Sequence, residues 1–133
     1  MKQNLILGIG CDRHVSLETL NTALDQALEK VKQSRDAVTA LASIDKKNDE
    51  VALLALAAQQ SWPLHFFSAG ELAKVDVPNP SAVVMKYMGT PAVAEAAAIL
   101  AAQTTQEDLL LEKHKYRGTD GKNATVSIVK STF

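Results

Sequence analysis

The sequence has few of the features on which secreted, membrane-bound or nucleic-acid-binding proteins depend. Its 133 residues include one cysteine, Cys11, which excludes an intrachain disulfide and fits a reducing compartment. No apolar run approaches the roughly 20 residues of a membrane span, and the run at residues 5–9 is too short for the core of a signal peptide. The net charge of −1 gives no overall attraction to nucleic acid or to an anionic membrane. We therefore expect a cytoplasmic protein with neither kind of partner.

Aromatic residues are also scarce, with three Phe, two Tyr and one Trp. The core must therefore consist of Ile, Leu, Val and Ala, which suits helices packed on a sheet better than an aromatic-rich β-sandwich. The length is typical of a single domain, and no internal repeat or low-complexity tract divides it. We expect residues 1–133 to form one domain.

Strand and helix patterns alternate through the first half of the chain. Residues 4–9, 38–44 and 64–67 resemble buried strands, and a helix is predicted after each, with Ser16 as the first N-cap and Ser68 opening a capping box. Later we expect a turn at 78–80, a short helix from 81 towards 89, a cap at 90–91, a helix over 93–102, and a hairpin with strands from 109 and over 124–129. This order predicts a three-layer helix/sheet/helix α/β sandwich. Its sheet is expected to have about five mostly parallel strands, with the hairpin at one edge.

The exits of the predicted parallel strands indicate where a ligand would bind. Ligands of such sheets lie beyond the carboxyl ends of the strands. The loop at Cys11, the loop at Asp45 and the turn at Ser68 are therefore expected at the same edge. Free N–H groups at the helix start after Ser16 could hold a carboxylate there. The sequence thus predicts one anion-binding site rather than three.

The first of these loops has more than one interpretation. Gly8 and Gly10 match the first two glycines of a dinucleotide-binding loop, but the third glycine of that loop is missing. This favours a structural turn or a close backbone approach. Cys11 is either a nucleophile, with a pKa lowered by Arg13 and a helix N-terminus, or a plain loop cysteine, which we favour.

Two charged clusters are also open to two interpretations. Residues 45–50 (D-K-K-N-D-E) form either a solvated loop with a helix cap or part of the site, and the basic stretch at 113–117 is either an exposed hairpin or part of the site. Three histidines and one cysteine make no spaced metal motif, and no Ser-His-Asp arrangement, catalytic carboxylate pair or P-loop is recognisable. We expect no metal and no cofactor.

Five segments, in order along nearly the whole chain, go further than these patterns. They are residues 8–13 (G-I-G-C-D-R), 42–50 (A-S-I-D-K-K-N-D-E), 64–72 (L-H-F-F-S-A-G-E-L), 89–98 (G-T-P-A-V-A-E-A-A-A), and Lys113 followed by 125–129 (T-V-S-I-V). Together they resemble the motifs of the CobE and CbiG C-terminal domain family of cobalamin (vitamin B12) biosynthesis. One departure is His14, which stands where the family usually has glycine.

The resemblance implies a role with precorrin intermediates, which are large macrocycles bearing several carboxylates. Because the chain begins almost at the first motif, we expect the free-standing CobE-like form. Arg13 could then bind a carboxylate bidentately, with Lys46, Lys47 and Lys113 adding charge-assisted hydrogen bonds. The full predicted ligand-binding set is Gly10, Cys11, Arg13, His14, Ser43, Asp45, Lys46, Lys47, Ser68 and Lys113.

The resemblance leaves three functions open. The first is an accessory protein that binds a precorrin and protects it or hands it on. The second is a hydrolase that opens a precorrin δ-lactone and releases acetaldehyde, as CbiG does, with Asp45 or Glu50 as general base. The third is a scaffold for other enzymes of the pathway. Glu95, on the Ala-rich helix, could point into the site or face solvent.

Overall fold

A computed structural model describes residues 4–75 and 93–131 of the chain. In chain order the elements are β1 (Asn4–Cys11), α1 (Leu17–Lys30), β2 (Val38–Ile44), α2 (Val51–Gln60), β3 (Leu64–Phe67), α3 (Ala69–Ala73), α5 (Val93–Ala102), β4 (Leu109–Arg117) and β5 (Asn123–Ser131). Short 3₁₀ turns at Arg35–Ala37, Asp45–Lys47 and Gln106–Asp108 join some of them. The turn predicted at 78–80, the helix from 81 towards 89 and the cap at 90–91 lie outside the described residues.

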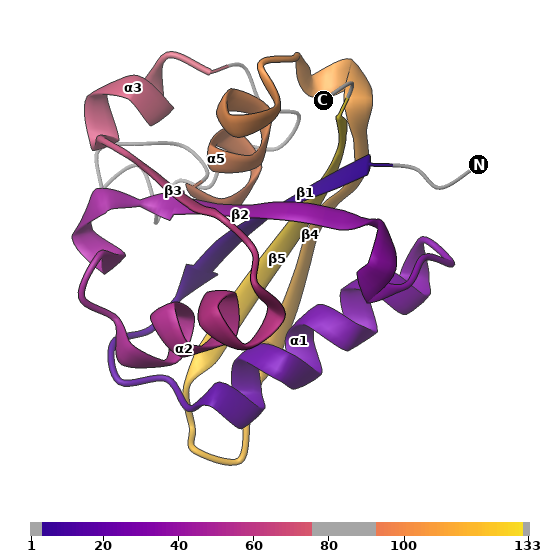
Figure 1. Ribbon diagram of the computed structural model, residues 1–133. Helices are drawn as coiled ribbons and strands as arrows, with labels where there is room; N and C mark the ends of the chain where they lie inside the picture. The colour runs from indigo at the N-terminus through magenta and orange to yellow at the C-terminus, as the bar shows by residue number, and fades with distance from the viewer. Residues whose placement is uncertain (1–3, 76–92, 132–133) are drawn as a thin grey trace.

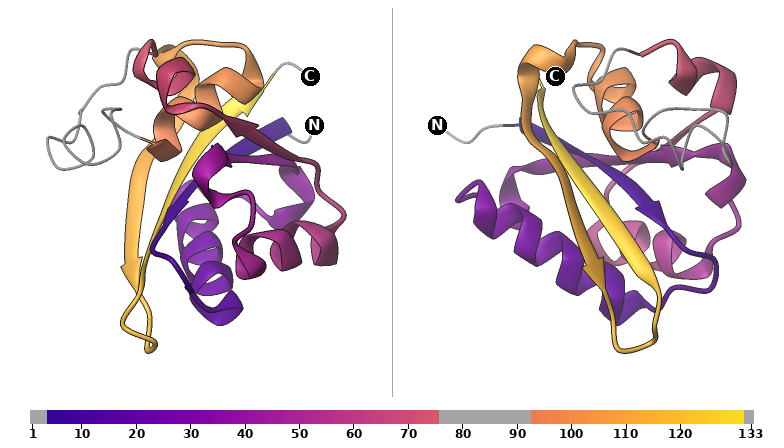
Figure 2. Two further views of the ribbon diagram at one scale, coloured as in Figure 1. Left: turned by 90° about the vertical axis from the view of Figure 1, so that its left-hand side faces the viewer. Right: turned by 180° about the vertical axis from the view of Figure 1, so that it is seen from behind.

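The described strands form one mixed sheet in the order β3-β2-β1-β5-β4. β1 pairs parallel with β2 and β2 with β3, whereas β5 is antiparallel to both β1 and β4. Helices α1 and α2 cover one face of the sheet, and α3 and α5 cover the other (Figures 1 and 2). The predicted three-layer α/β sandwich with a C-terminal hairpin at one edge is therefore confirmed.

Alternating side chains of β1 supply both halves of the core. Leu5, Leu7 and Ile9 pack towards α1 and α2, and Ile6 packs towards α5. Gly8 also belongs to the face that α5 covers, because a Cβ built on it would lie 1.8 Å from the carbonyl oxygen of Ala94. The helix thus approaches the strand so closely that only glycine fits.

The prediction of a glycine turn at this point was therefore wrong in part. Gly8 and Gly10 both lie inside β1, and neither has a positive φ. The close backbone approach, which was the other expectation, is what Gly8 provides. The strand continues to Cys11 before the chain turns, so the loop begins two residues later than the apolar run suggests.

The tip of the hairpin is fastened to the start of α1 by one carboxylate. Asp120 accepts hydrogen bonds from the backbone N–H of Ser16 (2.8 Å), from the hydroxyl of Thr19 (3.0 Å) and from the backbone N–H of Lys122 (3.0 Å). Desolvation, the largest single influence, acts to raise the pKa of Asp120, but these hydrogen bonds together lower it from 3.8 to about 2. The ionised form is therefore favoured by folding.

We expect Asp120→Asn to melt at a lower temperature than the wild type at pH 6. A depressed folded-state pKa stabilises the protein above the ordinary value of 3.8, and this contribution is lost as the pH falls through about 2. The difference between wild type and variant should therefore shrink between about pH 4 and pH 2. Thermal unfolding across that range, with Asp36→Asn as an exposed control, measures it. Equal melting at pH 6, or a difference independent of pH, would contradict the assignment.

Candidate functional site

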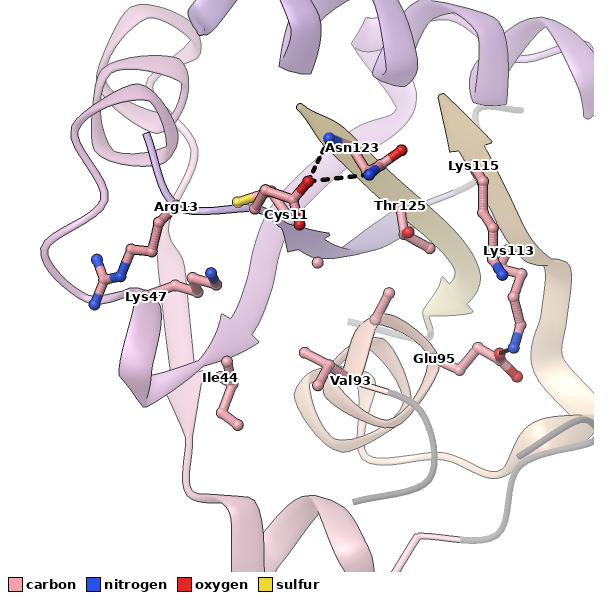
Figure 3. A pocket seen from close by; sticks show the side chains of 13 residues that line it. Cys11, Arg13, Ile44, Lys47, Val93, Glu95, Lys113, Lys115, Asn123 and Thr125 are labelled. Carbon is pink, nitrogen blue, oxygen red and sulfur yellow. Dashed lines mark hydrogen bonds and ion pairs between the residues drawn. The ribbon is translucent and has the colours of Figure 1, made fainter. Parts of the chain in front are cut away.

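A pocket of about 340 Å³ opens at the carboxyl ends of β1 and β2, between the start of α5 and the β4–β5 hairpin (Figure 3). Its described lining residues are Gly10, Cys11, Asp12, Arg13, Ile44, Lys47, Val93, Ala94, Glu95, Lys113, Lys115, Asn123 and Thr125. Ile44, Val93 and Ala94 make an apolar floor, and charged side chains surround it. The strand exits of β1 and β2 thus meet at one site, as their parallel pairing predicts.

The end of β1 is fixed to the start of β5 on one side of the pocket. The carboxylate of Asp12 accepts hydrogen bonds from the backbone N–H of Asn123 (2.8 Å) and from its side-chain amide (3.0 Å). The backbone N–H of Asp12 in turn donates to the carbonyl of Asn123 (3.0 Å). These three hydrogen bonds connect the end of β1 to the start of β5, so Asp12 holds this part of the pocket wall in place.

Arg13 ties the β1–α1 loop to the loop after β2. Its Nη1 lies 2.5 Å from Asp49 and 3.4 Å from Glu50, and its Nη2 donates to the carbonyl of Lys46 at 2.7 Å. The hydrogen bond to Asp49 is the main reason that the pKa of Arg13 is raised and that of Asp49 is lowered. Arg13 therefore lines the pocket, but most of its guanidinium is occupied by the protein itself.

Glu50 and His14 complete this loop arrangement. The Glu50 side chain is 4% exposed, and its Oε1 accepts the backbone N–H of His14 at 2.9 Å. His14 has a φ of 63°, in the left-handed region that glycine adopts at low cost. This conformation explains why a glycine suits the position. His14 is not among the lining residues of this pocket and instead lines a neighbouring depression beside α2.

Cys11 contributes a half-buried thiol to the pocket wall. Burial is the largest cause that raises its pKa to about 11, and the opposing effect of Lys47 is smaller. The thiol is therefore protonated at neutral pH, which disfavours the nucleophile interpretation because a thiolate is the reactive form.

The lysines of the pocket differ in whether an acidic side chain of the described residues pairs with them. Lys113 and Lys115 lie two residues apart on the same face of β4, opposite Lys47 (Figure 3). The ammonium of Lys113 lies 3.0 Å from Oε1 of Glu95 and pairs with that carboxylate. Lys47 and Lys115 form no ion pair with any residue of the described ranges. These two lysines are thus the cations that a ligand would meet.

Of the predicted ligand-binding residues, the structure brings together Gly10, Cys11, Arg13, Lys47 and Lys113. The others lie elsewhere among the described residues. Ser43 is fully buried in β2 and donates to the carbonyl of Ile9 at 2.7 Å, and Ser68 caps α3 in a capping box with Glu71. Asp45 and Lys46 are exposed on the 3₁₀ turn outside the pocket lining.

The predicted ligand-binding set lacks eight of the described lining residues, and the polar ones among these eight are Asp12, Glu95, Lys115, Asn123 and Thr125. The sequence left open whether Glu95 points into the site or faces solvent. The structure places it in the pocket wall, with its side chain 1% exposed. Lys115 could have been found from its period-2 spacing to Lys113 on a strand. Asn123 and Thr125 line the pocket because β5 is antiparallel to β1, so the amino end of β5 lies beside the carboxyl end of β1.

Neither a metal site nor a membrane-spanning helix is found among the described residues. In residues 4–75 and 93–131, no three or more His, Cys, Asp or Glu side chains are grouped so that they could hold a metal ion. None of the helices in these ranges combines the length and the apolar character that crossing a bilayer requires.

The model of the family described as "Cobalamin synthesis G C-terminus" matches residues 5–129. The chain belongs to this family. The resemblance carried by the five motifs is thereby confirmed, and so is the place of the chain in cobalamin biosynthesis.

Individual relatives agree with the family match. Cobalt-precorrin-5A hydrolase of Priestia megaterium is 32% identical over 124 residues, which cover 93% of this chain and 31% of the hydrolase. Protein CobE of Sinorhizobium sp. is 33% identical over 100 residues, covering 74% of this chain and 65% of that protein. The chain therefore spans about a third of the first curated relative and just under two-thirds of the second. A crystal structure of CobE, described as a protein from the cobalamin (vitamin B12) biosynthetic pathway, is 34% identical with a TM-score of 0.82, and the match covers 98% of this chain and 92% of that one.

Proposed function

We propose that the pocket binds a precorrin intermediate, which the protein protects or passes to another step of the pathway. The observation that carries this proposal is the placement of Lys47 and Lys115 on opposite sides of an apolar floor, neither paired with a described acidic residue. A precorrin has apolar ring surface at its centre and acetate and propionate carboxylates at its edge. Cations around an apolar floor complement both parts of such a ligand.

The size of the pocket suits an edge of the macrocycle. A cavity of about 340 Å³ is at the lower end of the roughly 300–1,000 Å³ of small-molecule sites. A macrocycle would therefore insert one side between α5 and the β1 exit and leave the rest outside the pocket. Such partial enclosure fits a protein that receives and releases an intermediate.

Titration with precorrin-5A and with cobalt-precorrin-5A tests the proposal. Binding should change the visible absorption of the ligand, and the ligand should elute with the protein in gel filtration. The proposal fails if neither compound gives a spectral change and neither co-elutes with the folded protein.

A lactone hydrolase is the second candidate, favoured by the similarity to a cobalt-precorrin-5A hydrolase and by a carboxyl group, Glu95, in the pocket wall. The predicted general bases are Asp45 and Glu50. We rank this function second because Asp45 lies outside the pocket lining and the Glu50 carboxylate faces Arg13 and His14. If either residue were the base, Asp45→Asn or Glu50→Gln would abolish acetaldehyde release and leave binding intact.

The remaining expectations have narrower support. A scaffold role would use the exposed faces of the protein, and co-purification with other pathway enzymes would favour it. The single cysteine supports the predicted cytoplasmic location, and the length supports the predicted single domain. Both the location and the domain number stay predictions.

A further inference from the structure

Glu95 is a buried carboxylate in the wall of a ligand pocket. It projects from α5 towards β4, where it meets Lys113 (Figure 3). The side chain of Glu95 is 1% exposed, its Oε1 lies 3.0 Å from the ammonium of Lys113, and its Oε2 has no hydrogen-bond partner among the described residues. Desolvation by burial is the largest influence on the pKa of Glu95 and raises it, and Lys113 opposes that shift. The carboxylate therefore has acceptor capacity that the described protein groups leave unused.

This arrangement has a cost that a ligand would remove. A buried acceptor without hydrogen bonds is unfavourable, so most buried polar groups in folded proteins have a partner. Because Lys113 contacts Oε1, the missing partner of Oε2 would have to come from the ligand. A ligand carboxylate would be repelled there, because Glu95 already neutralises Lys113.

We propose that the bound ligand places a hydrogen-bond donor, an N–H or O–H group, against Glu95, and that Glu95 and Lys113 form a neutral subsite rather than a contact for a ligand carboxylate. The inference rests on the proposed binding of a precorrin and specifies how that ligand is oriented. The carboxylates of the ligand go to Lys47 and Lys115, and a donor-bearing edge faces α5.

The variant Glu95→Gln tests this orientation through the direction of its effect. Removing the negative charge ends the repulsion from Glu95, so a ligand carboxylate at this position would bind more tightly to the variant. A donor at this position would lose its charged acceptor, and we expect about tenfold weaker binding of precorrin-5A. Glu18→Gln, in the exposed first turn of α1, is the matched control and should bind like the wild type.

The outcomes separate the inference from the proposed function. If the wild type binds precorrin-5A and Glu95→Gln binds it equally or more tightly, the inference is overturned and the proposed function stands. If the wild type does not bind, both are overturned. Circular dichroism verifies that the variant is folded.

If Glu95→Gln does not fold, Lys113→Gln decides the question, because its side chain is 22% exposed and easier to replace. At high salt, where long-range charge effects are screened, the inference predicts that Lys113→Gln binds precorrin-5A like the wild type. A loss of affinity at high salt as large as that of Lys47→Gln would mean that Lys113 contacts a ligand carboxylate, and would overturn the inference.

Discussion

A Gly8→Ala variant is expected to lose about 3 kcal/mol of unfolding free energy, although it adds only one methyl group. The new Cβ would lie 1.8 Å from the carbonyl oxygen of Ala94, 2.7 Å from its carbonyl carbon and 3.1 Å from the Cβ of Ala98. Two of these atoms belong to the backbone of α5, so no side-chain rotation can relieve the overlap. Either the helix moves away from β1 or the central strand bends.

The same movement would disturb the pocket, because Ala94 forms part of its floor. We therefore expect weaker ligand binding together with the loss of stability. Urea unfolding measures the stability, and Gly70→Ala is the matched control, since its nearest contact would be an ordinary 3.9 Å to Ser68 Oγ. A Gly8→Ala protein as stable as the wild type would show that α5 does not pack on the strand as described.

Replacing both free lysines of the pocket is expected to have the largest effect on binding. Lys47→Gln and Lys115→Gln should each weaken the affinity for a precorrin about fivefold, which corresponds to about 1 kcal/mol. The two side chains lie on opposite sides of the pocket and share no described partner, so the double variant should bind about 25-fold more weakly. Its affinity should also depend less on salt, because fewer charges are involved.

Lys30→Gln serves as the control for these variants. Lys30 is exposed at the end of α1 and lies outside the pocket. It should leave both the affinity and its salt dependence unchanged. If the double variant binds like Lys30→Gln, the carboxylates of the ligand are held by other groups and the assignment of Lys47 and Lys115 is wrong.

Elements set by local signals could be predicted from the sequence. Ser16 caps α1 through a hydrogen bond from the N–H of Thr19 at 3.1 Å, and Ser68 and Glu71 form the capping box that their spacing predicts. β2 covers residues 38–44 as expected, because an apolar run buried on both faces has few alternatives. The order of strands and helices then sufficed to predict the layers.

Contacts between distant parts of the chain could not be predicted. Arg13 carries the right chemistry for a ligand carboxylate, but Asp49 and Glu50, more than 30 residues away, occupy its guanidinium. Only the folded arrangement of the two loops shows this competition. Arg13 is thus better described as a residue that connects the two loops, and we expect Lys47 and Lys115 to make the ligand contacts instead.

The place of Glu95 was ambiguous for a related reason. Residues 94–99 of α5 are all buried, so the helix has no polar stripe in this stretch from which the direction of one carboxylate could be derived. The helix is covered on several sides because its alanines pack against β1 and β2. A helix of this kind conceals the orientation of its polar residue until its packing is known.

The most direct test of the account is a crystal structure of the protein with a bound precorrin. We predict that one edge of the macrocycle lies between the exit of β1 and the start of α5, with its carboxylates at Lys47 and Lys115 and a donor group at Glu95. A macrocycle bound outside this pocket, for example in the depression beside α2 that contains His14 and Val51, would contradict it.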